Sequence, residues 1–124
     1  VSMHLPLNGG TRGIVGAGEF AMMKPTAYFI NCARGEVVRE AELVEALSRG
    51  QIAGAALDVF EHEDPGRDNP LYHLDNVLLT PHIASFTHEA YSRLGSDAVR
   101  CIEDVLIRHR APEWPGNRPP LPRA

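Results

Sequence analysis

The chain has 124 residues and a formal net charge of −4, and 44% of its residues are hydrophobic while 23% are charged. This composition is typical of a water-soluble globular domain. The acidic balance excludes the broad basic surface on which nucleic-acid binding depends. No apolar run reaches the roughly 18 residues that a membrane span needs. We therefore expect no nucleic acid and no membrane among the partners.

Two cysteines, Cys32 and Cys101, stand far apart in the chain and match no metal-ligand spacing. We interpret both as reduced core thiols, which favours a cytoplasmic protein without a metal site. The opening residues VSMHLPL show neither a charged leader nor a cleavage site. Because residues 1–5 already have the pattern of a strand, we expect that sequence upstream of Val1 is missing.

Strand and helix patterns alternate along the chain. Extended runs are predicted at residues 1–5, 27–32, 52–60 and 77–80, and helices at residues 19–24, 39–49 and 87–108. The run AYFINC at 27–32 is almost wholly apolar and favours a strand buried on both faces. Strands that alternate with helices predict parallel βαβ units, and thus an α/β fold with a doubly wound parallel sheet.

The last predicted helix, at residues 87–108, is the longest periodic segment. Its apolar residues recur at helical spacing and form one stripe, which comprises Ala90, Leu94, Ala98, Cys101, Ile102, Val105 and Leu106. Residues 110–124 hold five of the ten prolines. This enrichment predicts an extended or disordered tail.

Ligands of parallel α/β sheets bind at the carboxyl ends of the strands, and this rule first singles out Arg34, which follows the run at 27–32. An arginine at such a place can grip a carboxylate through two parallel hydrogen bonds. The competing hypothesis is a surface arginine that pairs with Glu36 or Glu40. Position alone does not decide between the two.

The same rule singles out His82 and Asp58. His82 follows the run at 77–80 and is a candidate general acid–base, because the unperturbed pKa of histidine lies near neutrality; the alternative is a packed or helix-capping histidine. Asp58 opens an acidic stretch that also contains Glu63. For both carboxylates the sequence leaves a functional and a solvated role open, whereas Glu61 and Asp64 fit a solvated loop.

Residues 16–21 (GAGEFA) match the dinucleotide fingerprint G-x-G-x-x-A, and Glu36 supplies an acid about 20 residues further on. A phosphate loop requires a full strand before it and a long helix after it. Only Ile14 and Val15 precede this stretch, and Pro25 ends the helix early. We interpret the segment as a short connecting helix, with the binding of another nucleotide as the weaker hypothesis.

Long motifs of the chain resemble the NAD-binding domain of D-isomer-specific 2-hydroxyacid dehydrogenases. They are HLPLNGGTRGIV (4–15), MKPTAYFINCARGEVVREAELVEALSRGQIAGAALDVF (23–60), Pro70-Leu71 and NVLLTPHIA (76–84). The resemblance implies a partial Rossmann-like sheet, the second half of that domain, over residues 1–86. It further implies that a helix at 87–109 packs toward a substrate domain and that 110–124 is a proline-rich tail.

The resemblance also implies roles for single residues. Arg34 is similar to the arginine that binds the substrate carboxylate, His82 to the acid–base that moves the hydroxyl proton, and Glu63 to the acid that hydrogen-bonds this histidine and keeps it protonated. The family usually has proline directly after that glutamate, whereas here Asp64 intervenes before Pro65. Cofactor-lining positions are implied at Leu5, Pro6, Thr11, Cys32, Ala33, Arg34, Asp58, His82 and Ala84.

The function implied is that of an NAD(P)-dependent oxidoreductase that oxidises D-2-hydroxy acids or reduces 2-keto acids. NAD is the expected cofactor, and NADP stays open because the family's ribose-contacting residue lies upstream of these motifs. The resemblance further implies a homodimeric full-length enzyme, of which residues 1–124 are a fragment without the phosphate-binding loop. The alternative hypothesis is a non-catalytic, truncated Rossmann-like module that acts in dimerisation or protein interaction.

Overall fold

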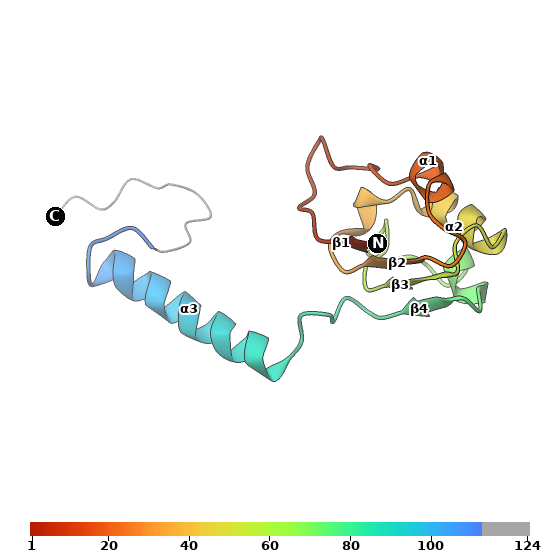
Figure 1. Ribbon diagram of the computed structural model, residues 1–124. Coiled ribbons are helices and arrows are strands. Elements are labelled where there is room, and N and C mark those ends of the chain that lie inside the picture. The colour runs from red at the N-terminus through yellow and green to blue at the C-terminus, as the bar shows by residue number, and fades with distance from the viewer. Residues whose placement is uncertain (113–124) are drawn as a thin grey trace. The chain divides into compact units, whose positions relative to one another are not determined.

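The computed structural model describes residues 1–112 of the chain. Its strands form one parallel sheet in the order β1-β2-β3-β4, as Figure 1 shows. The strands are β1 (Ser2–Met3), β2 (Tyr28–Asn31), β3 (Gly54–Leu57) and β4 (Val77–Leu79), and the α-helices are α1 (Ala17–Ala21), α2 (Glu40–Ser48) and α3 (His88–Leu106). Two short 3₁₀ turns lie at Gly35–Val37 and Pro70–His73. The predicted alternation of strands and helices and the parallel sheet are confirmed.

Internal contacts divide the chain into two units, of which the first is Val1–Ala84 and the second begins at Ser85. Each unit is described by itself. None of the helices within residues 1–112 is both long enough and apolar enough to cross a lipid bilayer.

The elements are shorter than the sequence patterns predicted, and one is displaced. The helix expected at residues 19–24 lies at Ala17–Ala21 instead. It begins earlier because the carboxylate of Glu19 reaches back and accepts a hydrogen bond from the backbone N–H of Gly16 at 2.8 Å. Glu19 is thus the third residue of the helix and not its first.

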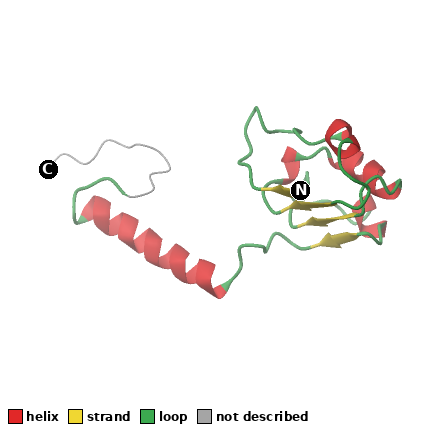
Figure 2. Ribbon diagram, in the orientation of Figure 1, coloured by secondary structure: helices red, strands yellow, loops and turns green. Residues whose placement is uncertain are grey.

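The core of the first unit lies between one face of the sheet and the helices α1 and α2. Figure 2 shows both helices on the same side of the sheet. Phe20 of α1 and Phe29 of β2 are fully buried and meet edge to face, with ring centroids 5.4 Å apart. Leu43 and Leu47 of α2 complete this layer.

The opposite face of the sheet is open within the described residues. Exposure alternates along β2, so that Tyr28 is 63% exposed while Phe29 is fully buried. Leu78 of β4, on the same side as Tyr28, is 66% exposed. The expectation that the run at 27–32 is buried on both faces is therefore wrong for this chain, because both helices of the first unit cover a single face.

The second unit is built on α3. Thr87 caps its first turn by accepting a hydrogen bond from the backbone N–H of Ala90 at 3.1 Å. The predicted helix is confirmed, and residues of its apolar stripe such as Leu94 and Leu106 are exposed within this unit. Most of the predicted proline-rich tail, residues 113–124, lies outside the described residues.

Candidate active site

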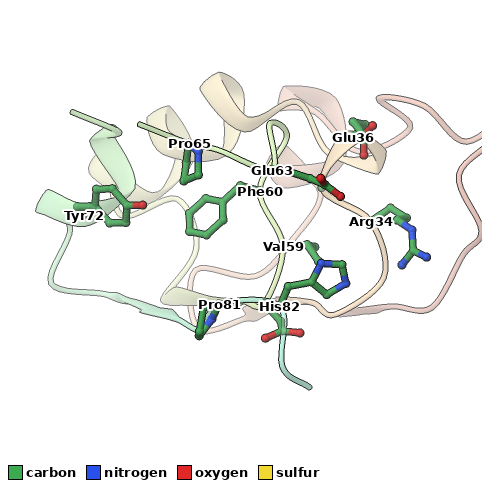
Figure 3. A pocket seen from close by; sticks show the side chains of 11 residues that line it. Arg34, Glu36, Val59, Phe60, Glu63, Pro65, Tyr72, Pro81 and His82 are labelled. Carbon is green, nitrogen blue, oxygen red and sulfur yellow. The ribbon is translucent and has the colours of Figure 1, made fainter. Parts of the chain in front are cut away.

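A cavity of about 450 Å³ opens at the carboxyl edge of the sheet. Its lining includes all four side chains that the sequence singled out at or after the strand ends: Arg34, Asp58, Glu63 and His82. The remaining wall is largely apolar, and Figure 3 shows most of it together with Arg34, Glu63 and His82; it comprises Gly35, Glu36, Val59, Phe60, Pro65, Tyr72 and Pro81. The fold therefore gathers residues from three separate loops around one space.

Arg34 reaches the cavity because the buried Asn31 turns the chain at the end of β2. The side chain of Asn31 accepts a hydrogen bond from the backbone N–H of Ala33 and donates one to the backbone carbonyl of Arg34, both at 3.0 Å. Arg34 is exposed and, within the described residues, forms no ion pair with Glu36 or Glu40. The surface-pairing hypothesis is therefore wrong. Nη1 of Arg34 instead donates a hydrogen bond to the backbone carbonyl of Ala33 at 2.7 Å.

Close packing explains why a glycine stands at position 35. The φ angle of Gly35 is not among the positive ones, so the backbone conformation does not require a glycine here. Instead, a Cβ atom at this position would overlap the backbone carbonyl of Phe60. Only glycine lets the segment after β2 lie directly against the segment after β3, which brings Arg34 to the loop that carries Glu63.

Asp58 is 3% exposed and holds the turn that carries His82. Its carboxylate accepts hydrogen bonds from the hydroxyl of Thr80 and from the backbone N–H groups of Ile83 and Ala84, the latter two at 2.8 Å each. Burial alone would raise the pKa of Asp58, but these hydrogen bonds and the nearby His82 outweigh it and hold the pKa below its ordinary value.

His82 has a left-handed backbone conformation, with φ of 56°. Such a conformation is uncommon for a residue other than glycine and costs free energy, which the hydrogen bonds of Asp58 to the next two residues offset. The imidazole is exposed and borders the cavity. The helix-capping alternative is wrong, because Thr87 is the residue that caps α3.

Glu63 also borders the cavity and is exposed. Within the described residues no hydrogen bond joins it to His82, so its role stays a prediction; catalytic hydrogen bonds often form only when substrate is bound. Glu61, two residues earlier, accepts a hydrogen bond from the backbone N–H of Glu40 at 3.1 Å and does not line this cavity. The expectation of a solvated role for Glu61 is therefore wrong.

A second, more open groove lies on the other side of Arg34, at the ends of β1 and β2. Its lining includes four of the predicted cofactor positions, namely Leu5, Pro6, Cys32 and Ala33, and Arg34 borders both spaces. Cys32 is exposed here, so its interpretation as a core thiol is wrong. Both cysteines are free, as expected.

The other two predicted cofactor positions support backbone turns. The hydroxyl of Thr11 donates a hydrogen bond to the carbonyl of Pro6 at 2.7 Å and accepts one from the backbone N–H of Asn8 at 2.8 Å. Thr11 therefore supports the backbone of Pro6, which lines the groove. The backbone N–H of Ala84 is bonded to Asp58, and Ala84 lines neither space.

The fingerprint-like stretch at residues 16–21 does not form a phosphate loop. The first N–H groups of α1 are already taken by the chain's own carboxylates, since Gly16 donates to Glu19 and Ala17 donates to Glu42. A helix end filled by two carboxylates repels an anion. The interpretation of this segment as a short connecting helix is confirmed.

A cavity at the carboxyl edge of a parallel sheet, bordered by an arginine, a histidine and the three carboxylates of Glu36, Asp58 and Glu63, is the arrangement of a ligand-binding α/β enzyme domain. Residues 1–84 match the model of the family described as D-isomer specific 2-hydroxyacid dehydrogenase, NAD binding domain. The chain belongs to this family, as its motifs predicted, and its sheet is part of a Rossmann-like fold.

Relatives and solved structures support this assignment. The chain is 45% identical over 123 residues to D-3-phosphoglycerate dehydrogenase of Methanocaldococcus jannaschii, covering 99% of this chain and 23% of that protein. It is 50% identical over 106 residues to glyoxylate reductase of Thermofilum pendens, covering 86% and 31%. The crystal structure of D-lactate dehydrogenase with NAD⁺ from Lactobacillus jensenii superposes with a TM-score of 0.82 at 33% identity, covering 94% and 39%. The chain thus spans between about a quarter and two fifths of these proteins.

The packing of Gly35 can be tested by the substitution Gly35→Ala. The new methyl group would overlap the carbonyl of Phe60, and we expect a loss of about 1–3 kcal/mol or more in the free energy of unfolding, the usual cost of overpacking. Gly18→Ala is the matched control, because a Cβ there meets no atom within 4 Å and lies in α1. Urea unfolding of the two variants measures both effects, and an equally small change in both would contradict the packing explanation.

The role of Asp58 predicts a pH-dependent stability. Because its pKa in the folded chain lies below the unfolded value of about 3.9, its hydrogen bonds stabilise the fold fully above that pH and are lost as the pH falls through the folded-state pKa. Asp58→Asn should therefore lower the free energy of unfolding by about 1–3 kcal/mol at pH 7, with a smaller difference from wild type near pH 3. Denaturant unfolding at the two pH values measures this. A difference independent of pH would contradict the role of the charged carboxylate.

Proposed function

We propose that this chain forms the catalytic edge of an NAD-dependent oxidoreductase that interconverts D-2-hydroxy acids and 2-oxo acids. The observation that carries the proposal is the position of Arg34, which borders both the cavity of Glu63 and His82 and the groove of Leu5 and Cys32. A substrate in the cavity and a cofactor in the groove would therefore meet beside one cationic side chain.

The names of the relatives support the substrate class. A phosphoglycerate, glyoxylate and lactate are small acids with an oxygen function next to the carboxylate, and the matched proteins are named for acting on them. Arg34 suits the feature that these acids share, because a guanidinium binds a carboxylate through two parallel hydrogen bonds. The apolar wall of Phe60, Pro65 and Tyr72 suits the part in which they differ.

The residues present fit one end of a dinucleotide. The groove at the ends of β1 and β2 is lined by His4, by small or apolar groups and by the cation of Arg34, which suits the nicotinamide end. The first N–H groups of α1 are filled by carboxylates, so this helix offers nothing to the pyrophosphate. When bound, NAD supplies or accepts the hydride at C2 of the acid; a clear preference for NADPH in a cofactor titration would replace NAD by NADP in this proposal.

The chain's own residues perform the proton and charge chemistry. In the direction of reduction, the protonated imidazole of His82 donates a proton to the oxygen at C2 as negative charge develops there. The guanidinium of Arg34 holds the carboxylate and offsets part of the same charge. The carboxylate of Glu63 orients the imidazole of His82 toward the oxygen at C2 through its charge. In oxidation the imidazole takes the proton back from the hydroxyl group.

We propose a homodimer in the cytoplasm, supported by the exposed apolar stripe of α3 and by the free thiols. The exposed sheet face around Tyr28 and Leu78 favours the alternative of a non-catalytic interaction module. A non-catalytic module does not require an arginine, a histidine and a carboxylate around one cavity. The enzyme is therefore the better-supported function.

Removal of the acid–base gives the first test of this function. In the native polypeptide, His82→Ala should lower kcat for reduction of a 2-oxo acid by about 10²- to 10⁴-fold, the usual range for loss of a general acid–base. His73→Ala is the control, because His73 is exposed and lies outside the cavity lining. Steady-state turnover of glyoxylate and hydroxypyruvate with NADH measures both variants, and an unchanged rate in His82→Ala would remove this residue from the mechanism.

The role of Arg34 predicts a selective loss of substrate binding. Arg34→Ala should raise KM for the 2-oxo acid by about 10-fold or more, since a charged bidentate hydrogen bond is lost, while the Kd for NADH changes little. Arg49→Ala is the control, because Arg49 pairs with Glu45 on the exposed face of α2. Titration of NADH by fluorescence and of substrate by turnover separates the two effects. An equal loss of both would indicate a structural role.

A further inference from the structure

The loop that carries Glu63 is tied at both ends to one carboxylate. Oε2 of Glu40 accepts a hydrogen bond from the backbone N–H of Glu61 at 2.9 Å, and Oε1 of Glu40 accepts one from Nδ2 of Asn69 at 2.7 Å. Glu61 opens the loop and Asn69 closes it. Both oxygens of a single side chain, on the first residue of α2, therefore fix the two ends of the segment between them.

The hydrogen bonding between Glu40 and Glu61 is reciprocal, and Asn69 has a further backbone partner. Oε2 of Glu61 accepts a hydrogen bond from the backbone N–H of Glu40 at 3.1 Å. Asn69 is buried, and its Oδ1 accepts a hydrogen bond from the backbone N–H of Leu71 at 2.9 Å. Among the described residues, neither Glu40 nor Glu61 forms an ion pair. Each carboxylate thus has uncharged N–H groups as partners, and hydrogen bonds to a charged group are the stronger kind.

Between the two ends of the loop, Pro65 is half-buried and the other side chains of residues 62–68 are exposed. The side chains of His62, Glu63 and Asp64 are exposed, so packing does not hold them. The hydrogen bond from the backbone N–H of Gly66 to Asp64 is local to the loop. The position of Glu63 therefore depends on the hydrogen bonds that anchor the loop ends.

We propose that Glu40, Glu61 and Asn69, here called the loop clasp, are positioning residues that hold Glu63 at the cavity of Arg34 and His82. The clasp joins the two segments that matter, because Glu40 follows Arg34 across the 3₁₀ turn Gly35–Val37. This role rests on the proposed function, since it presupposes that Glu63 acts on His82. None of the three clasp residues lines the cavity or the groove.

The donor and acceptor pattern of the clasp allows a test by exchange of partners. In Glu40→Gln a single acceptor oxygen remains, and the new amide nitrogen faces a donor, so one tie is lost. In Asn69→Asp two carboxylates face each other, which is also unfavourable. The double variant Glu40→Gln/Asn69→Asp restores a matched set, because the amide donates to the new carboxylate while the backbone N–H groups of Glu61 and Leu71 keep their acceptors.

Hydrogen exchange of the loop amides in the native polypeptide is the first readout. Each single variant should exchange the amide of Glu61 or its neighbours about 10- to 100-fold faster, the effect of losing a hydrogen bond to a charged group. The double variant should return to within about threefold of wild type. Glu45→Gln is the matched control on the same helix, because Glu45 pairs only with Arg49. Unchanged exchange in both single variants would overturn the clasp.

The second readout is the pH profile of kcat, which a purely structural role would not shift. Glu40→Gln should change the profile in the same direction as Glu63→Gln, while KM for NADH stays constant, and it should add no more than about twofold to the loss in a Glu63→Gln background. If the losses in kcat of Glu40→Gln and Glu63→Gln multiply in the double variant, the positioning role is overturned. A wild-type polypeptide that reduces no 2-oxo acid would refute the proposed function instead, and the exchange experiment would still decide whether the clasp fixes the loop.

Discussion

The buried carboxylate of Asp58 is the interaction on which the rest of the site depends. It takes three hydrogen bonds from the segment after β4, one of them from a hydroxyl and two from backbone N–H groups. These bonds hold His82 in a left-handed conformation that would otherwise cost about 1–3 kcal/mol. The charge of Asp58, which lines the cavity, therefore fixes the position of the imidazole. The parallel sheet brings Arg34 to the same edge.

Close approach of two backbones is the second constraint. Gly35 lies against the backbone carbonyl of Phe60. The hydrogen bonds between Glu40 and Glu61 join the same two segments again, at positions further along each segment. The segment of Arg34 and the loop of Glu63 are thus joined by packing at one point and by hydrogen bonds at the next. These two contacts fix how the two segments approach each other at the cavity.

The sequence predicted the order of the elements and the polar residues at the strand ends that line the cavity, because both follow from local patterns. Short apolar runs mark parallel strands, and the carboxyl ends of parallel strands meet at one edge, so Arg34, Asp58 and His82 could be found without coordinates. The functions of Glu61 and Asn69 could not, because each depends on Glu40, which lies more than 20 residues away along the chain. The hydrogen bonds of Asn31 are local, and the sequence patterns did not single them out. The open sheet face was missed for a related reason: apolarity along YFIN does not reveal that only one face meets a helix.

The central claim is that this edge of the sheet serves hydride transfer to C2 of a 2-oxo acid. The most direct test is to supply NADH with deuterium at both C4 positions to the native polypeptide, with glyoxylate or hydroxypyruvate, and to analyse the product by mass spectrometry. One deuterium at C2 of the 2-hydroxy acid is the predicted result. A product without deuterium, or no product from any 2-oxo acid, would contradict the assignment of this site.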